Sequence, residues 1–144
     1  MQEPSLSCGQ GDDEAYRFLW LRTWDHPIAI RIFRRGDRYG LAAVLLSGSG
    51  GYGPGTLSRR VTKNLSRAQW QRFIAALDQT RFWQATTTID DTLGNDGAQW
   101  IIEGRREGRY HYVDRWGGAD RVEAVRPLGE MLIEFSELQV GNVY

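Results

Sequence analysis

A strongly marked helix, predicted over residues 66–80, limits the folds open to this chain. Ser66 is an N-cap with Gln69 three residues later, and Leu65 and Trp70 occupy the positions of a hydrophobic staple. Apolar residues then recur at the spacing of one helix face, at Trp70, Phe73, Ile74 and Leu77. Such a stripe must lie on a sheet or on another helix, so strands or helices elsewhere must supply that surface.

The chain before this helix has the pattern of strands. Aromatic and branched residues mark strands over 16–24, 28–33 and 39–46, and a weaker alternation over 56–64 predicts an exposed edge strand. Residues 48–55 contain five glycines and one proline and are expected to form a loop. The first half therefore predicts a four-strand meander.

The second half repeats the theme as a hairpin and a helix. Strands are expected over 98–104 and 109–116, with Glu107-Gly108 as a two-residue turn. This register sets Glu103 against Tyr112 on one face and Ile102 against Val113 on the other. Asp120 and Glu123 offer a cap for a last helix, but Pro127 requires a kink or a start near residue 126.

This order of elements predicts an α+β domain. Its antiparallel sheet has about six strands, from the N-terminal meander and the later hairpin, and two helices pack on one face. Residues 16–139 form the expected domain, with a disordered polar tail over 1–15 and a C-terminal tail over 140–144. At 144 residues the chain can bury a full core without a metal or disulfides.

Charge and composition exclude several classes of function. The 18 basic and 18 acidic residues cancel, which argues against a general nucleic-acid or anionic-membrane binder. No stretch approaches the roughly 18 apolar residues of a membrane span. No cofactor is expected. We expect a cytoplasmic protein if Met1 is the natural start, or a periplasmic lipoprotein anchored on Cys8 if a signal has been removed.

Two loops carry motifs that are open to more than one interpretation. Residues 48–53 satisfy G-x-G-x-x-G, but a strand-like segment follows instead of the helix that a phosphate site requires, which favours a connector. Tyr52 is an aromatic anchor if this loop docks into a partner. The oxygen-rich segment 90–97 offers Asp90, Asp91 and Asp96 as calcium ligands or forms a plain turn cluster.

The later hairpin holds the one set of residues with catalytic potential. Glu103 and Asp114 share a face in the predicted register and could serve a carboxylate-based hydrolase acting on a glycan, with His111 close in sequence. The alternative is an ordinary sheet surface, on which Arg17 and Arg115 neutralise the two carboxylates.

Both predicted hairpin turns contain the pattern Arg-Arg-x-x-Arg-Tyr, beginning at Arg34 and at Arg105. Of the 18 basic residues only Lys63 is a lysine. If the turns lie together, they place six guanidinium groups at one end of the sheet, where they favour carboxylate or phosphate partners. The simpler interpretation is that these arginines keep the turns solvated.

One stretch resembles a signature of small uncharacterised bacterial proteins. It reads Asp96-Gly97-x-x-Trp100-x-x-Glu103-Gly104, continued by Tyr110-His111-x-Val113-x-Arg115-Trp116. The resemblance covers about 20 residues and implies a bacterial origin and a similar α+β domain, without an activity. Packing accounts for the tryptophans and glycines of the signature, but not for Glu103, His111 and Arg115 together.

We therefore expect a non-catalytic bacterial protein-binding domain, such as an immunity protein that neutralises a cognate toxin, or an inhibitor. A carboxylate-based hydrolase and a subunit of a larger assembly are the alternatives, and the oligomeric state stays open. Tyrosine and arginine are enriched at interface hot spots. The candidate partner-binding residues are Tyr52, Arg35, Arg38, Arg105, Arg106, Arg109, Tyr110 and Tyr112.

Overall fold

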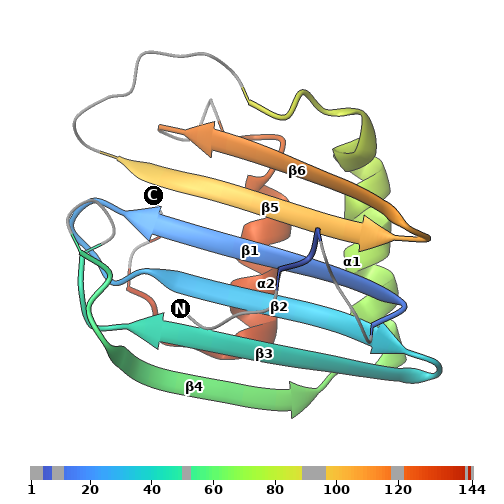
Figure 1. The fold of residues 1–144 in the computed structure, drawn as a ribbon, viewed down its shortest axis with the longest axis horizontal. Helices are drawn as coiled ribbons and strands as arrows, with labels where there is room; N and C mark the ends of the chain where they lie inside the picture. The colour runs from blue at the N-terminus through green and yellow to red at the C-terminus, as the bar shows by residue number, and fades with distance from the viewer. Residues whose placement is uncertain are drawn as a thin grey trace.

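The predicted strands form one antiparallel sheet in the order β4-β3-β2-β1-β5-β6 (Figure 1). The computed structural model describes residues 5–7, 12–49, 53–88, 97–117, 122–141 and 143. Its strands are β1 (Glu14–Arg22), β2 (Ile28–Arg35), β3 (Arg38–Leu46), β4 (Leu57–Asn64), β5 (Ala98–Arg106) and β6 (Arg109–Trp116). The helices are α1 (Arg67–Gln79) and α2 (Arg126–Ser136), with a short 3₁₀ turn η1 (Phe82–Gln84). The expected α+β class is confirmed.

Both helices cover the same face of the sheet, which we call the helix face (Figure 1). Alternate residues of β1 and β5 point into this core, and Phe18, Trp20 and Trp100 are fully buried there. Gly129 of α2 permits the close approach, because a Cβ at this position would lie 2.7 Å from Cζ3 of Trp100. Among the described residues no helix lies against the opposite side of the sheet, and we call that side the open face.

The helix starts follow the predicted signals. Ser66 caps α1, accepting from the backbone N–H of Gln69, while the Gln69 side chain accepts from the backbone N–H of Ser66. The predicted apolar stripe of α1 packs against the sheet. The last helix begins at Arg126 with Pro127 in its first turn, so the proline starts the helix rather than kinking it. The predicted cap Asp120 lies outside the described residues.

The predicted register of the later hairpin is confirmed. Glu103 pairs with Tyr112, and Ile102 pairs with Val113. The turn has positive φ at both central positions, 52° at Glu107 and 76° at Gly108, as a two-residue turn of the type I′ class requires.

The described fold extends beyond the expected domain limits of residues 16 and 139. β1 begins at Glu14, and Leu6, placed by the sequence in a polar tail, is 2% exposed. At the other end Val140 and Val143 pack against the core. The Val140 carbonyl accepts a hydrogen bond from the buried Arg22 at 2.7 Å. Described residues near both ends of the chain therefore contribute to the packed structure.

Candidate functional site

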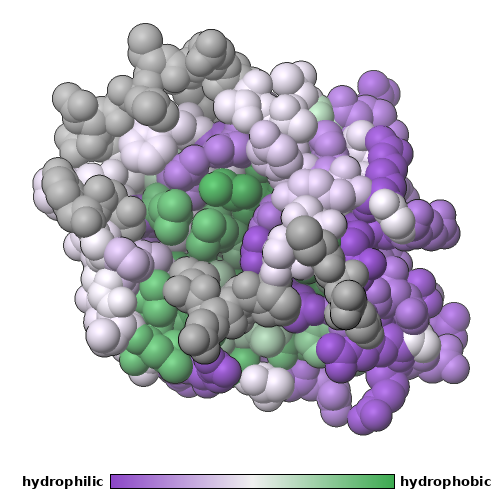
Figure 2. All heavy atoms as spheres, viewed as in Figure 1, coloured by the Kyte–Doolittle hydropathy of each residue, from purple (hydrophilic) through white to green (hydrophobic). Residues whose placement is uncertain are grey.

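The open face combines an apolar area with charged residues. Leu19 and Leu21 of β1 and Ile101 of β5 point to this side and are only half-buried. Figure 2 looks onto the open face and shows apolar residues gathered away from the hairpin turns, beside a strongly hydrophilic end. An antiparallel sheet with one solvated face normally presents polar residues there. The apolar content of the open face therefore marks it as a candidate binding surface.

A short N-terminal segment lies over this same face. In Figure 1 residues 5–7 run in front of the sheet, on the side away from the helices. Leu6 is buried, yet it does not belong to the cluster between the sheet and the helices. The chain thus covers part of its own open face.

A polar cluster occupies the centre of β1, β5 and β6 on the open face. Arg17 lies directly across from Glu103, and its Nη2 is 2.5 Å from Oε2 of that carboxylate. The Tyr110 hydroxyl donates to the other oxygen, Oε1, at 2.8 Å. Burial raises the pKa of Tyr110, and the hydrogen bond to Glu103 raises it further. The phenol therefore stays protonated at neutral pH and remains a donor.

Two tyrosines stand at the outer border of this cluster. Tyr110 and Tyr112 of β6 are each 37% exposed, and their ring centroids are 6.3 Å apart. The Glu103 hydrogen bond holds the first ring, which limits the side-chain entropy that a partner would have to remove. The two tyrosines therefore form an aromatic surface that solvent reaches and in which a hydrogen bond holds one of the rings.

The second candidate carboxylate has its own partner. Asp114 shares the open face with Glu103, as the sequence predicted, and sits diagonally from it on β6. Both of its carboxylate oxygens lie 3.0 Å from the Gln99 amide nitrogen. Arg17 and Tyr110 hold Glu103 instead, so the two carboxylates have different partners.

His111 lies on the other side of the sheet. It packs on the helix face with its ring centroid 5.2 Å from that of Phe82 and 6.2 Å from that of Trp83. Burial lowers the pKa of His111, and its Nε2 has no hydrogen-bond partner among the described residues. The sheet therefore separates this imidazole from Glu103, and the suggested set of Glu103, His111 and Asp114 is not brought together.

Arg115 also points to the helix face, where it is 5% exposed. Its guanidinium donates to the main-chain carbonyls of Thr86 at 2.7 Å and Thr87 at 3.2 Å. Burial lowers the pKa of this arginine. Arg115 and the Asp114 carboxylate lie on opposite faces and are in no described ion pair, and the guanidinium anchors the segment after η1. Packing thus explains the two residues of the signature, His111 and Arg115, for which the sequence suggested another role.

The two arginine-rich turns lie at the same end of the sheet (Figure 1). β2 and β5 both pair antiparallel with β1, so both strands end where β1 begins. The structure therefore places the six arginines of the two turns at one end of the sheet, as the sequence predicted. Their environment differs from the expectation, because the chain itself supplies acidic partners.

Asp12 occupies the arginine end on the open face. Its carboxylate forms ion pairs with Arg31 and Arg35, the latter at 2.5 Å. Its main-chain carbonyl accepts from the Arg105 guanidinium at 2.5 Å. The side chain of Asp12 is 2% exposed. Asp12 therefore connects the N-terminal segment to β2 and β5, the strands that lead into the two arginine-rich turns.

Glu14 performs a related role on the helix face. Its carboxylate lies 3.5 Å from Arg34 and 3.9 Å from Arg106, and it accepts from the Tyr16 hydroxyl at 2.5 Å. Sequence reasoning missed Asp12 and Glu14 because both lie in the expected tail. The acidic run at residues 12–14 was the available signal.

The remaining turn arginines have different surroundings. Arg109 donates to the Trp83 carbonyl at 2.9 Å and lies over the Trp83 ring, 5.2 Å from its centroid. Arg38 is exposed and lines two surface hollows beside β4. Three arginines of the two turns, Arg38, Arg105 and Arg109, are in none of the described ion pairs, and the last two donate to main-chain carbonyls.

Other predicted positions, namely Tyr52, Cys8, Asp90, Asp91 and Asp96, lie outside the described residues. Within the described part of the chain, no group of three or more histidine, cysteine or acidic residues is placed to hold a metal. No helix of that part is long and apolar enough to cross a membrane. Comparison with known protein families and with curated proteins finds no match.

Proposed function

We propose that this chain is a non-catalytic protein-binding domain that docks a partner protein on its open face, in the role of an inhibitor or immunity protein. The observation that carries the proposal is the composition of that face. An apolar area around Leu19, Leu21 and Ile101 adjoins the exposed pair Tyr110 and Tyr112. Protein interfaces have this arrangement, with an apolar centre, a polar rim and enrichment in tyrosine and arginine.

The charges of the open face support a protein partner more than a small polyanion. Arg17, Arg31 and Arg35 are each paired with an acidic side chain of the chain itself. A phosphate-rich ligand would have to displace these carboxylates. A protein surface can instead contact the paired groups at their borders while it covers the apolar area.

The hydrolase alternative has less support. A carboxylate pair needs one group free to donate or accept a proton at the substrate. Here Glu103 contacts Arg17 and Tyr110, while Asp114 contacts Gln99. Each carboxylate therefore acts as a positioned acceptor within the sheet surface.

The test is affinity capture from host extract, followed by purification of what is retained. We expect a partner that binds the wild-type chain and a control variant Arg72→Ala on the exposed side of α1. We expect that the double variant Tyr110→Ala/Tyr112→Ala loses it, with binding weaker by about 2 kcal/mol or more. Calorimetry with the purified partner measures the affinity and the stoichiometry.

The inhibitor role makes a separate demand. The purified partner should be toxic or enzymatically active alone, and one equivalent of this chain should suppress that activity. Equal retention by the double variant would contradict the assigned face. A partner whose activity is unchanged by binding would contradict the inhibitor role, and self-association of the chain through Tyr112 would replace the partner with a second copy.

A further inference from the structure

The two edges of the sheet are finished differently. Beside β6, the segment after η1 covers the edge: the Asp114 N–H donates to the Thr87 carbonyl at 2.7 Å, and Thr88 forms a parallel bridge with Asp114. β4 pairs with β3 on its inner side. On its outer side no strand in the described part of the chain is paired with it. The β4 edge therefore presents backbone groups that can accept another strand.

The register shows which backbone groups point outward. The Leu65 N–H donates to the Tyr39 carbonyl, so hydrogen-bonded pairs alternate from this point along β3 and β4. In this alternation Lys63 and Val61 bond to β3, opposite Leu41 and Ala43. The residues between them, Arg60, Thr62 and Asn64, direct their N–H and C=O groups away from the sheet. These three residues form a regular outward ladder.

The side chains of β4 are cationic. Arg59 and Arg60 are exposed, and Lys63 lies 2.5 Å from Glu137 just beyond α2. The strand itself contains no acidic residue. Two copies paired through this edge would bring the cations of two β4 strands together with no acidic residue on either strand, and like charges on paired strands are destabilising. The charge of the strand therefore disfavours a second copy and favours an acidic segment.

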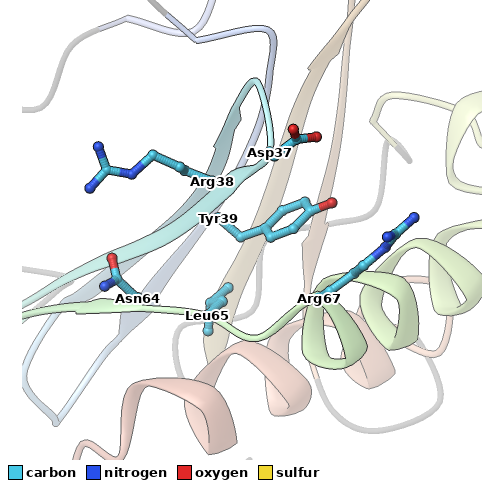
Figure 3. A pocket seen from close by; sticks show the side chains of 6 residues that line it. All are labelled: Asp37, Arg38, Tyr39, Asn64, Leu65 and Arg67. Carbon is cyan, nitrogen blue, oxygen red and sulfur yellow. The ribbon is translucent and has the colours of Figure 1, made fainter.

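Two hollows flank the end of β4, one on each face of the sheet. The hollow on the open face, about 460 Å³, is lined by Phe33, Arg38 and Thr62 among others, and the Phe33 ring lies over Gly40 at its floor. The hollow on the helix face, about 360 Å³, is lined by Tyr39, Leu65 and Arg67 among others. Figure 3 shows Arg38 extending to one side of β3 while Tyr39 points to the other.

This arrangement matches an added strand, because successive side chains of a strand point to opposite faces. One side chain of the incoming segment would reach the hollow beside Arg38, and the next would reach the hollow beside Arg67. Main-chain pairing supplies affinity in such complexes, while the pockets for alternate side chains supply selectivity.

We propose that the β4 edge binds an extended, acidic segment of a partner protein as a seventh strand. Three observations carry this assignment: the outward ladder at Arg60, Thr62 and Asn64, the cationic side chains of β4, and the hollow on either side of its end. The surface is distinct from the apolar part of the open face, so the two proposals can fail independently.

The test uses three labelled eight-residue peptides and the full chain. The first alternates glutamate and valine, the second has lysine in place of glutamate, and the third is the acidic peptide with a central proline. Fluorescence anisotropy should show binding of the first peptide, with affinity about tenfold or more lower for the other two, since each loses charge complementarity or ladder hydrogen bonds. Hydrogen exchange should slow at the amides of Arg60, Thr62 and Asn64 on binding.

Two variants locate the surface. Thr62→Pro removes an outward donor without removing a bond to β3, which is where an edge strand tolerates proline. Arg60→Glu reverses one charge, and Arg81→Glu, on the exposed loop after α1, is its matched control. Both edge variants should weaken binding about tenfold while the control binds as wild type. Circular dichroism checks that each variant folds.

Equal binding of the proline-interrupted peptide would overturn the proposal, because attraction of charge alone would then explain the signal. Absence of binding by all three peptides would also overturn it and would leave the cations of β4 as protection against edge pairing. Dimerisation of the wild-type chain through β4 would assign the edge to a second copy instead.

Discussion

The two faces of the sheet differ in what covers them, although the same strands supply both. On the helix face Phe18 and Trp20 are fully buried, while between and beside them Leu19 and Leu21 point to the open face and stay half-buried. Near-continuous apolar strands are typical of sheets that are covered on both sides. The helices cover one side only. The apolar residues on the open face are therefore of the kind that a second layer normally buries, and the N-terminal segment buries part of them.

Truncation of one large residue on each face is the strongest test of this difference. Trp100→Ala should lower the free energy of unfolding by about 3–5 kcal/mol, because it opens a cavity in the helix-face core. Ile101→Ala, one residue later on the open face, should cost about 1 kcal/mol, because less of its surface is removed from water. Chemical denaturation measures both. Equal losses would mean that the two faces are equally packed.

Arginines provide a second comparison between the faces. Arg115→Ala should lower the free energy of unfolding by about 1–3 kcal/mol, because it removes the hydrogen bonds to the carbonyls of Thr86 and Thr87, and only the Thr87 carbonyl keeps another donor, the Asp114 N–H. Arg17→Gln on the open face removes a partly exposed ion pair and should cost about 1 kcal/mol or less. Thermal melts of the two variants, recorded at equal salt, would contradict the account if the open-face variant were the less stable.

Leu6→Glu tests whether the N-terminal segment covers the open face. A buried charge at this position should detach the segment locally, expose apolar surface and raise the fluorescence of an apolar dye. The loss of unfolding free energy should be about 1 kcal/mol, since the helix-face core is untouched. Ser7→Glu, at an exposed neighbouring position, is the matched control. Unchanged dye fluorescence in Leu6→Glu would show that the segment does not protect this face.

The smallest expected effect is a pH dependence from His111 on the helix face. Burial lowers its pKa in the fold, whereas the unfolded chain titrates near the ordinary value of about 6.5. The unfolded state therefore binds the proton more readily, and the stability present above about pH 6.5 declines as the pH falls toward the folded pKa. His111→Phe should remove this part of the decline. Denaturation curves of both proteins across the acid range give the unfolding free energy at each pH. If His111 does not contribute, this free energy will change with pH in the same way in both proteins.

The helices and strands could be predicted because the residues that start, end and turn them are close together in the sequence. The capping box at Ser66, the proline at the start of α2 and the two-residue turn at Glu107 each involve neighbours in the chain, and the turn also set the register of β5 and β6. The pairing of β1 with β5 joins residues 76 to 92 positions apart, and no local pattern encodes it.

The candidate site was predictable to a smaller extent. Glu103 and Tyr112 were placed correctly across the hairpin, and the same register already puts His111 on the opposite face, since strand side chains alternate. The acidic partners of the arginine end could not be foreseen. Asp12 and Glu14 become neighbours of both turns only once β1 lies between β2 and β5.

Site-specific photo-crosslinking from the two faces tests the central claim most directly. A photoreactive phenylalanine would replace Tyr112 on the open face or Asp78 on the exposed side of α1, in the full chain expressed in host cells. We predict one discrete crosslinked protein from position 112 and none from position 78. The same adduct from both positions, or an adduct from position 78 alone, would contradict the assignment of the open face as the binding surface.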